Sequence, residues 1–196
     1  MGKGRLEAFS DGVLAIIITI MVLELRPPHG VGFSDLRPLL PVFLSYILSF
    51  IYVGIYWNNH HHLLQAAQHT NGRVLWANLH LLFWLSLVPF TTAWLGEHPG
   101  ARGPVIAYGL VLFGAGLAYY LLSLSLVHAH GRSSTLARAI GRDGKGIASM
   151  LLYALAIIVA FFSINISIVI YTAVALLWIV PDSRIERKLA HEEPEA

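Results

Sequence analysis

The residue in this sequence with the clearest chemical potential is Asp11, a carboxylate only about four residues inside the first hydrophobic run. An ionisable group inside a long apolar segment is a candidate functional residue and needs a partner. His80 is polar in an otherwise apolar stretch and would lie at a similar depth, so we expect it to pair with Asp11; Arg5 is the other candidate. Such a pair could be a structural anchor between helices, or a network that responds to pH through the histidine.

The histidine run His60 to His62 resembles a metal site, but its spacing argues against one. Consecutive residues of a helix face different directions, so three neighbours cannot converge on one ion. The residues that do share a face bring no carboxylate or thiolate; they are Asn58, His62, Gln65 and His69. The chain also lacks a nucleophile elbow, an HExxH motif and a phosphate-binding glycine loop. We therefore expect no metal, no cofactor and no enzymatic activity.

A stripe of branched aliphatic residues follows on the first hydrophobic run: Ile16, Ile20 and Leu23. On an ideal helix these three lie within roughly 60° of one another, and the acidic residue described above points roughly 140° away from Ile16. Thr19 lies about 60° from Ile16, and its hydroxyl could face the same side or bond back to the carbonyl of Ala15. The stripe could face lipid, pack against protein, or form an apolar constriction that excludes water and blocks ions until it widens.

Composition indicates the environment in which these side chains act. The 196 residues are 56% hydrophobic and only 12% charged, whereas soluble domains carry about 25% charged residues. The chain is therefore predicted to be an integral membrane protein. It has no cysteine, which excludes disulfides and thiolate metal sites. The basic residues flank apolar segments rather than forming a soluble face, so we expect no nucleic-acid binding.

Apolar runs of about 20 residues predict membrane-spanning helices. We predict an all-α membrane protein with one domain over residues 1–196 and spans at 7–25, 39–60, 74–95, 104–127, 147–163 and 165–180. The last two come from dividing the run 147–180, which as one helix would be roughly 50 Å long. On the second span a polar stripe, expected to hydrogen-bond other helices, comprises Ser45, Ser49, Tyr52 and Tyr56.

The distribution of lysine and arginine predicts the orientation. With six spans, ten of these residues lie on the side of the two termini and three on the opposite side. The positive-inside rule then places both termini in the cytoplasm.

The segment from Arg5 to Asp11, RLEAFSD, matches an RxxxFSD signature. In this motif, and in its six predicted spans, the chain resembles the bacterial, single-repeat form of the transmembrane protein 175 family, which is known for lysosomal potassium channels in animals. The resemblance implies a potassium-permeable homotetramer in a prokaryotic plasma membrane, with the first helices of four subunits lining the pore. Monovalent cations, lipid and further copies of the chain would be its partners, and K⁺ would permeate without a cofactor.

The resemblance also assigns roles to individual residues. It implies that Ile16 forms the narrowest ring of the pore, that Ile20 and Leu23 form neighbouring apolar rings, and that Thr19 lines the pore or contributes to selectivity. It further implies a structural network at the start of the first helix, comprising Arg5, Phe9, Ser10, Asp11 and His80.

Two other functions remain open from the residues themselves. A proton-coupled secondary transporter could use Asp11 and His80, although the chain shows no internal repeat of the kind common in transporters. A non-conducting membrane scaffold could use the apolar stripe only for packing. A channel of this sequence would have to select ions without the potassium-filter sequence TVGYG, which the chain lacks.

Overall fold

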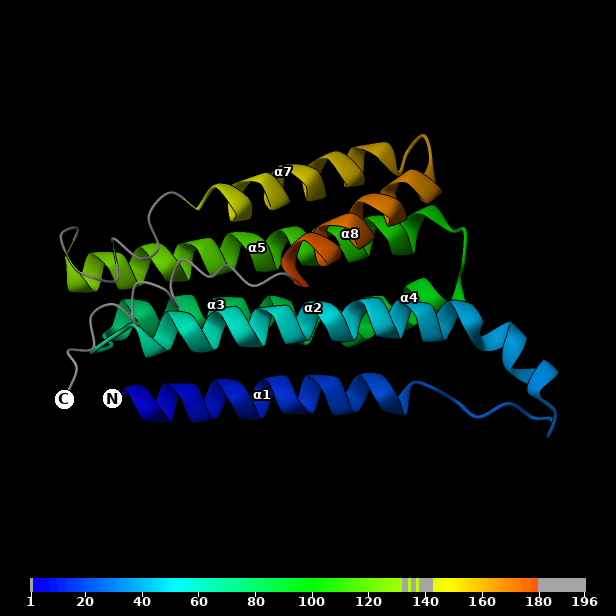
Figure 1. The fold of residues 1–196 in the computed structure, drawn as a ribbon, viewed down its shortest axis with the longest axis horizontal. Coiled ribbons are helices and arrows are strands. Elements are labelled where there is room, and N and C mark those ends of the chain that lie inside the picture. The colour runs from blue at the N-terminus through cyan, green and yellow to red at the C-terminus, as the bar shows by residue number, and fades with distance from the viewer. Residues whose placement is uncertain (1, 132–133, 135–136, 138–142, 180–196) are drawn as a thin grey trace, which may run out of the picture.

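The computed structural model describes residues 2–131, 134, 137 and 143–179, and these residues form a bundle of apolar helices (Figure 1). No strand occurs in the described part of the chain. In chain order the elements are α1 (Lys3–Leu23), η1 (Phe33–Leu39), α2 (Leu40–Gln65), α3 (Gly72–Ser86), α4 (Val88–Glu97), α5 (Arg102–His130), α7 (Gly144–Val159) and α8 (Ile164–Ile179). The predicted all-α fold is confirmed. The residues after Ile179, including the last one of the predicted span 165–180, lie outside the described residues, as does most of the basic loop before α7.

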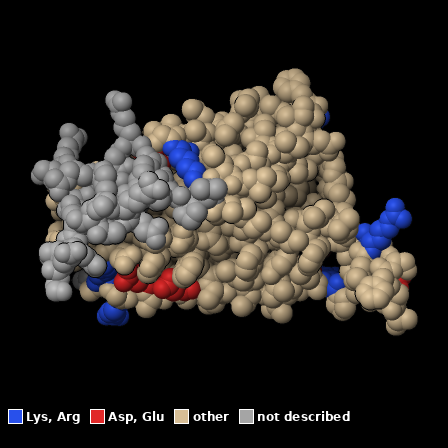
Figure 2. Space-filling view, viewed as in Figure 1, with Lys and Arg blue, Asp and Glu red and all other residues tan. Residues whose placement is uncertain are grey.

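Four helical segments among the described residues are long and apolar enough to cross a membrane. They are α1, η1 with α2, α3 with α4, and α5. Helices α7 and α8 have 16 residues each, a length of about 24 Å against a hydrocarbon core of about 30 Å. Charged side chains lie toward the two ends of the long axis in Figure 2, and the surface between them is uncharged, as expected for a protein whose middle faces lipid.

The third predicted span, 74–95, forms two helices rather than one, because Pro89 lies inside it. Proline has no N–H, and its ring clashes with the carbonyl four residues earlier. The helical ladder is therefore interrupted at Leu87, which joins the end of α3 to the start of α4. At the other end of α3 the side chain of Asn71 accepts a hydrogen bond from the amide of Val74 at 3.1 Å and caps the helix.

Helix α5 lies in the middle of the bundle and approaches its neighbours closely at glycines. A Cβ atom added at Gly114 would overlap the ring of Trp84 on α3, and one added at Gly109 would overlap the Tyr171 hydroxyl on α8. Small residues at such positions let helix backbones approach within a membrane.

Hydrogen bonds between helices add to this packing, as predicted for the polar stripe on α2. Ser45 donates to the carbonyl of Thr92, Ser49 bonds the Tyr108 hydroxyl at 3.0 Å, and Tyr52 donates to the carbonyl of Tyr171. Three of the four stripe residues therefore connect α2 to other helices. Helix α1 lies at one edge of the bundle and α7 at the opposite edge (Figure 1), and α1 packs against α2, α3 and α4.

Candidate functional site

Helix α1 has one face that packs against the rest of the chain. Its buried residues are Leu6, Ser10, Leu14, Ile17 and Met21. Their spacing of three or four residues places them on a single side of the helix. On an ideal helix this side is centred roughly 120° from Ile16. The buried face therefore fixes the direction in which the rest of α1 points.

The predicted apolar stripe is uncovered in the single chain. Exposed fractions are 58% for Ile16, 43% for Ile20 and 79% for Leu23, and Phe9 on the same side is 52% exposed. The stripe therefore does not serve packing within one copy of the protein. A face this apolar, next to a well-packed one, is available either to lipid or to a second protein surface.

Thr19 lies beside the stripe and is exposed. Its hydroxyl donates to the carbonyl of Ile16 at 2.8 Å, and not to that of Ala15, the acceptor considered from the sequence. Because the proton of the hydroxyl is used within the helix, the oxygen still presents lone pairs to the uncovered side. Arg5 is also exposed and, by helical spacing, lies on this same side near the start of α1.

The residue that anchors α1 to the bundle is Ser10. Its hydroxyl accepts a hydrogen bond from Asn78 Nδ2 on α3 at 2.9 Å and donates to the carbonyl of Leu6 at 2.8 Å. Asn78 Oδ1 lies 2.7 Å from His60 Nε2 on α2. An amide oxygen can only accept, so the imidazole donates here and carries its proton on Nε2. Ser10 and Asn78 are 0% exposed and His60 is 2% exposed. This buried series of hydrogen bonds therefore connects α1, α3 and α2.

The predicted pair of Asp11 and His80 does not form. Asp11 is exposed, and its Oδ1 accepts a hydrogen bond from Trp57 Nε1 on α2 at 3.0 Å. His80 Nε2 accepts from Trp84 Nε1, one turn later in its own helix, also at 3.0 Å. The reason is rotational. Asp11 lies about 100° around the helix from Ser10, so with Ser10 directed at α3 the carboxylate turns toward α2.

Sequence reasoning missed Asn78 and His60 as partners of the motif. Asn78 is a polar residue in an apolar stretch, which is the same signal that singled out His80 two positions later. Residues two positions apart on a helix point about 200° apart. Only one of Asn78 and His80 can therefore face α1. The histidine run is divided in the same way, because His60 points to Asn78 and His61 stacks on Trp57 with ring centroids 6.2 Å apart. Among the described residues no cluster of three or more histidines and carboxylates could hold a metal ion.

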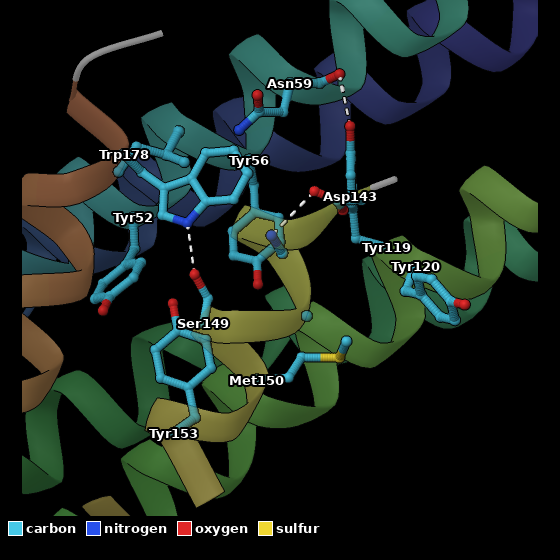
Figure 3. A pocket seen from close by; sticks show the side chains of 13 residues that line it. Tyr52, Tyr56, Asn59, Tyr119, Tyr120, Asp143, Ser149, Met150, Tyr153 and Trp178 are labelled. Carbon is cyan, nitrogen blue, oxygen red and sulfur yellow. Dashed lines mark hydrogen bonds between the residues drawn. The ribbon is translucent and has the colours of Figure 1, made fainter. Parts of the chain in front are cut away.

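A small cavity lies between α2, α5, α7 and α8 (Figure 3), with a volume of about 40 Å³. Aromatic rings line it, and its polar groups bond to one another. Trp178 Nε1 donates to Ser149 Oγ at 2.8 Å, and the Tyr119 hydroxyl donates to the Asn59 carbonyl at 3.2 Å. Ligand pockets in proteins usually measure about 300–1,000 Å³, so this cavity is too small to be a substrate site.

These features define a multi-pass α-helical membrane protein whose first helix is anchored on one face and uncovered on the other. A sequence model of the family described as "Endosomal/lysosomal potassium channel TMEM175" matches residues 5–89. A potassium channel of Chryseobacterium sp. (strain P1-3) is 54% identical over 96% of this chain and 98% of its own length. The chain belongs to the TMEM175 family of channels. The resemblance inferred from the RxxxFSD motif is confirmed.

Two further relatives show how much of the architecture is shared. The crystal structure of a lysosomal potassium-selective channel TMEM175 homolog from Chamaesiphon minutus superposes with a TM-score of 0.79 at 31% identity, covering 91% of this chain and 96% of that chain. The human endosomal/lysosomal proton channel TMEM175 is 25% identical over 98% of this chain but only 41% of its own length. The match thus covers nearly the whole length of the Chamaesiphon minutus protein but less than half of the length of the human protein.

Proposed function

We propose that this protein is a potassium-permeable cation channel formed by four copies of the chain around their first helices. The observation that carries the proposal is the uncovered stripe on α1, which is apolar, continuous and directed away from the rest of the subunit. One helix per chain cannot enclose a pathway alone, so the pore needs several copies. The potassium-channel names of the bacterial relatives support the choice of ion.

We propose that the gate is a set of stacked apolar rings. Four Ile16 side chains would form the narrowest ring, with Ile20 and Leu23 forming the next two over about 10 Å of the pore axis. A narrow apolar constriction excludes water, and an ion that cannot keep its hydration shell does not pass until the constriction widens. Thr19 would supply a hydroxyl oxygen to the same pathway, because its proton is donated to its own helix.

The RxxxFSD motif is proposed to hold α1 in the rotation that this pore requires. Ser10 fixes the inner side of the helix through Asn78. Asp11 fixes its flank through Trp57, while Arg5 and Phe9 face the pore entrance. His80 stabilises α3 from within, because its hydrogen bond stays in that helix. Without a pair of Asp11 and His80, a transporter that uses them for proton coupling has no support.

The membrane arrangement follows from the same proposal. Helices α7 and α8 would complete six spans in a single domain, in a prokaryotic plasma membrane with both termini in the cytoplasm. Among the described residues Lys3, Arg5 and Arg73 lie at the end of the bundle that holds the N-terminus, and the positive-inside rule favours the cytoplasm for that end. No cofactor is required, because the permeating ion is the only small partner.

A flux assay on purified protein in potassium-loaded vesicles tests the channel. Wild-type protein should release potassium, and Ile16→Asn should raise or deregulate the flux because the constriction becomes wettable. Ile158→Asn is the matched control, since Ile158 on α7 is 59% exposed and Ile16 is 58% exposed. Vesicles that stay tight to potassium with both wild type and Ile16→Asn would refute the channel.

Cross-linking separates a pore from a scaffold. The chain has no cysteine, so a single cysteine introduced at Ile20 is the only thiol. Around a shared axis these thiols should oxidise to linked subunits, whereas a cysteine at Ile158 on the outer edge should not. Absence of linked subunits for the Ile20 variant would contradict the arrangement of first helices around one axis.

A further inference from the structure

Two adjoining surface grooves, of about 940 and 440 Å³, lie between α3 and α5 at the end of the bundle that holds the N-terminus. Arg73, Ser125 and His128 line both of them. The other residues of the first groove are Asn71, Gly72, Trp76 and Ala129, and those of the second are Leu121, Leu124, Val127 and Gly131. The shared residues make the two grooves one continuous surface.

The charge of this surface is positive. Arg73 is exposed, and within the described part of the chain its hydrogen bond runs from Nη1 to His128 Nε2 at 3.4 Å. A guanidinium can only donate, so the imidazole is the acceptor and Arg73 keeps its full charge. No aspartate or glutamate is among the described residues that line either groove. An anion placed against Arg73 would therefore meet no opposing carboxylate among these described residues.

Apolar side chains continue the surface toward the middle of the membrane. Trp76 is 75% exposed, Leu124 is 46% exposed and Leu121 is 39% exposed. Leu124 and Leu121 precede His128 by about 6 and 10 Å along α5, on the side away from the helix end. The surface is thus charged at the level of a lipid headgroup and apolar at the level of acyl chains, with a tryptophan at the boundary where membrane proteins place this residue.

We propose that this surface binds an anionic phospholipid, with the phosphate against Arg73 and an acyl chain along Leu121 and Leu124. Basic pockets between membrane helices recognise anionic headgroups in this way. A free phosphate ion would satisfy the arginine but would leave the apolar wall uncovered, so the structure favours the lipid. The inference does not depend on the proposed pore, because no residue of α1 lines either groove.

Native mass spectrometry of the purified full-length protein tests the site. The protein is titrated with phosphatidylglycerol, with phosphatidylcholine and with glycerol 1-phosphate, the soluble headgroup fragment. Wild type should bind phosphatidylglycerol more tightly than phosphatidylcholine. R73Q should lower the phosphatidylglycerol affinity about five-fold, since one basic residue near an anionic surface contributes about 1 kcal/mol. R37Q removes the same charge from exposed η1 at the opposite end and should change nothing.

Equal losses for R73Q and R37Q would overturn the site, because they would indicate a general effect of net charge. Equal binding of the two lipids would also overturn it. Displacement of phosphatidylglycerol by glycerol 1-phosphate at the same concentration would assign the site to free phosphate compounds and refute the lipid. A melting temperature of R73Q close to that of wild type confirms that the variant is folded.

Discussion

The buried hydrogen bonds that join Ser10, Asn78 and His60 allow the loss of stability in a variant to be predicted as a number. Asn78→Ala removes its hydrogen bonds to Ser10 at 2.9 Å and to His60 at 2.7 Å, and leaves the buried His60 N–H without that acceptor. Each bond contributes about 1 kcal/mol, and an unsatisfied buried group costs about 1–3 kcal/mol. We expect a loss of about 2–4 kcal/mol in the free energy of unfolding. For a chain of this size that corresponds to a fall of roughly 5–15 °C in melting temperature.

The assay is thermal unfolding of purified protein in detergent, followed by tryptophan fluorescence. Ser10→Ala should cost less, about 1–2 kcal/mol, because Asn78 keeps its bond to His60. The double variant should cost about 1 kcal/mol less than the sum of the single ones, since both remove the same contact. Ser86→Ala is the control: Ser86 is exposed and bonds only within its own helix. A change for Asn78→Ala no larger than that control, or strictly additive effects, would refute the reasoning.

Three further variants can be measured in the same assay. Gly114→Ala should lower the melting temperature, because overpacking against the adjacent indole costs about 1–3 kcal/mol, whereas Gly54→Ala, with free space around it, should not. His130→Ala should cost about 1–2 kcal/mol and speed proteolysis of the α2–α3 loop, because its Nε2 accepts two amides of that loop at 2.9 and 3.3 Å; unchanged proteolysis would contradict this. Trp57→Phe should shift the melting temperature by under about 2 °C, since the bond to Asp11 is exposed; a larger fall would give that bond a greater structural role.

The class of fold and the exposed face of α1 could be predicted because both follow from local regularities. A charged fraction of 12% excludes a soluble domain. The helical period then groups Ile16, Ile20 and Leu23 without any knowledge of neighbouring helices. The break in the third span was not predicted, because the apolar run is long enough for one continuous helix. Pro89 is the residue that indicates the break, since proline cannot continue the helical ladder.

The partners of Ser10 could not be predicted, for a physical reason. Periodicity tells which residues of a helix share a face, but the rotation of one helix relative to another depends on packing along their whole length. Asn78 and His80 are equally conspicuous polar residues in the sequence. Only the rotation of α3, set in part by the close contact between Gly114 and Trp84, decides that Asn78 faces α1. Asp11 attracted attention by its charge, yet the uncharged neighbour Ser10 makes the buried contact.

The positions of anchor and stripe on α1 constrain how the proposed gate could open. Ser10 and Ile16 lie about 120° apart around the helix and about 9 Å apart along it, so turning α1 far enough to withdraw the isoleucines would pull Ser10 away from Asn78. That turn would leave buried polar groups unpaired, at a cost of about 1–3 kcal/mol for each. In the proposed tetramer, tilting α1 together with α3 would keep the contact and would still widen the ring of four first helices. Opening by tilt should therefore cost less free energy than opening by rotation. In a variant without the Asn78 amide, the two motions should no longer differ by this hydrogen-bond cost.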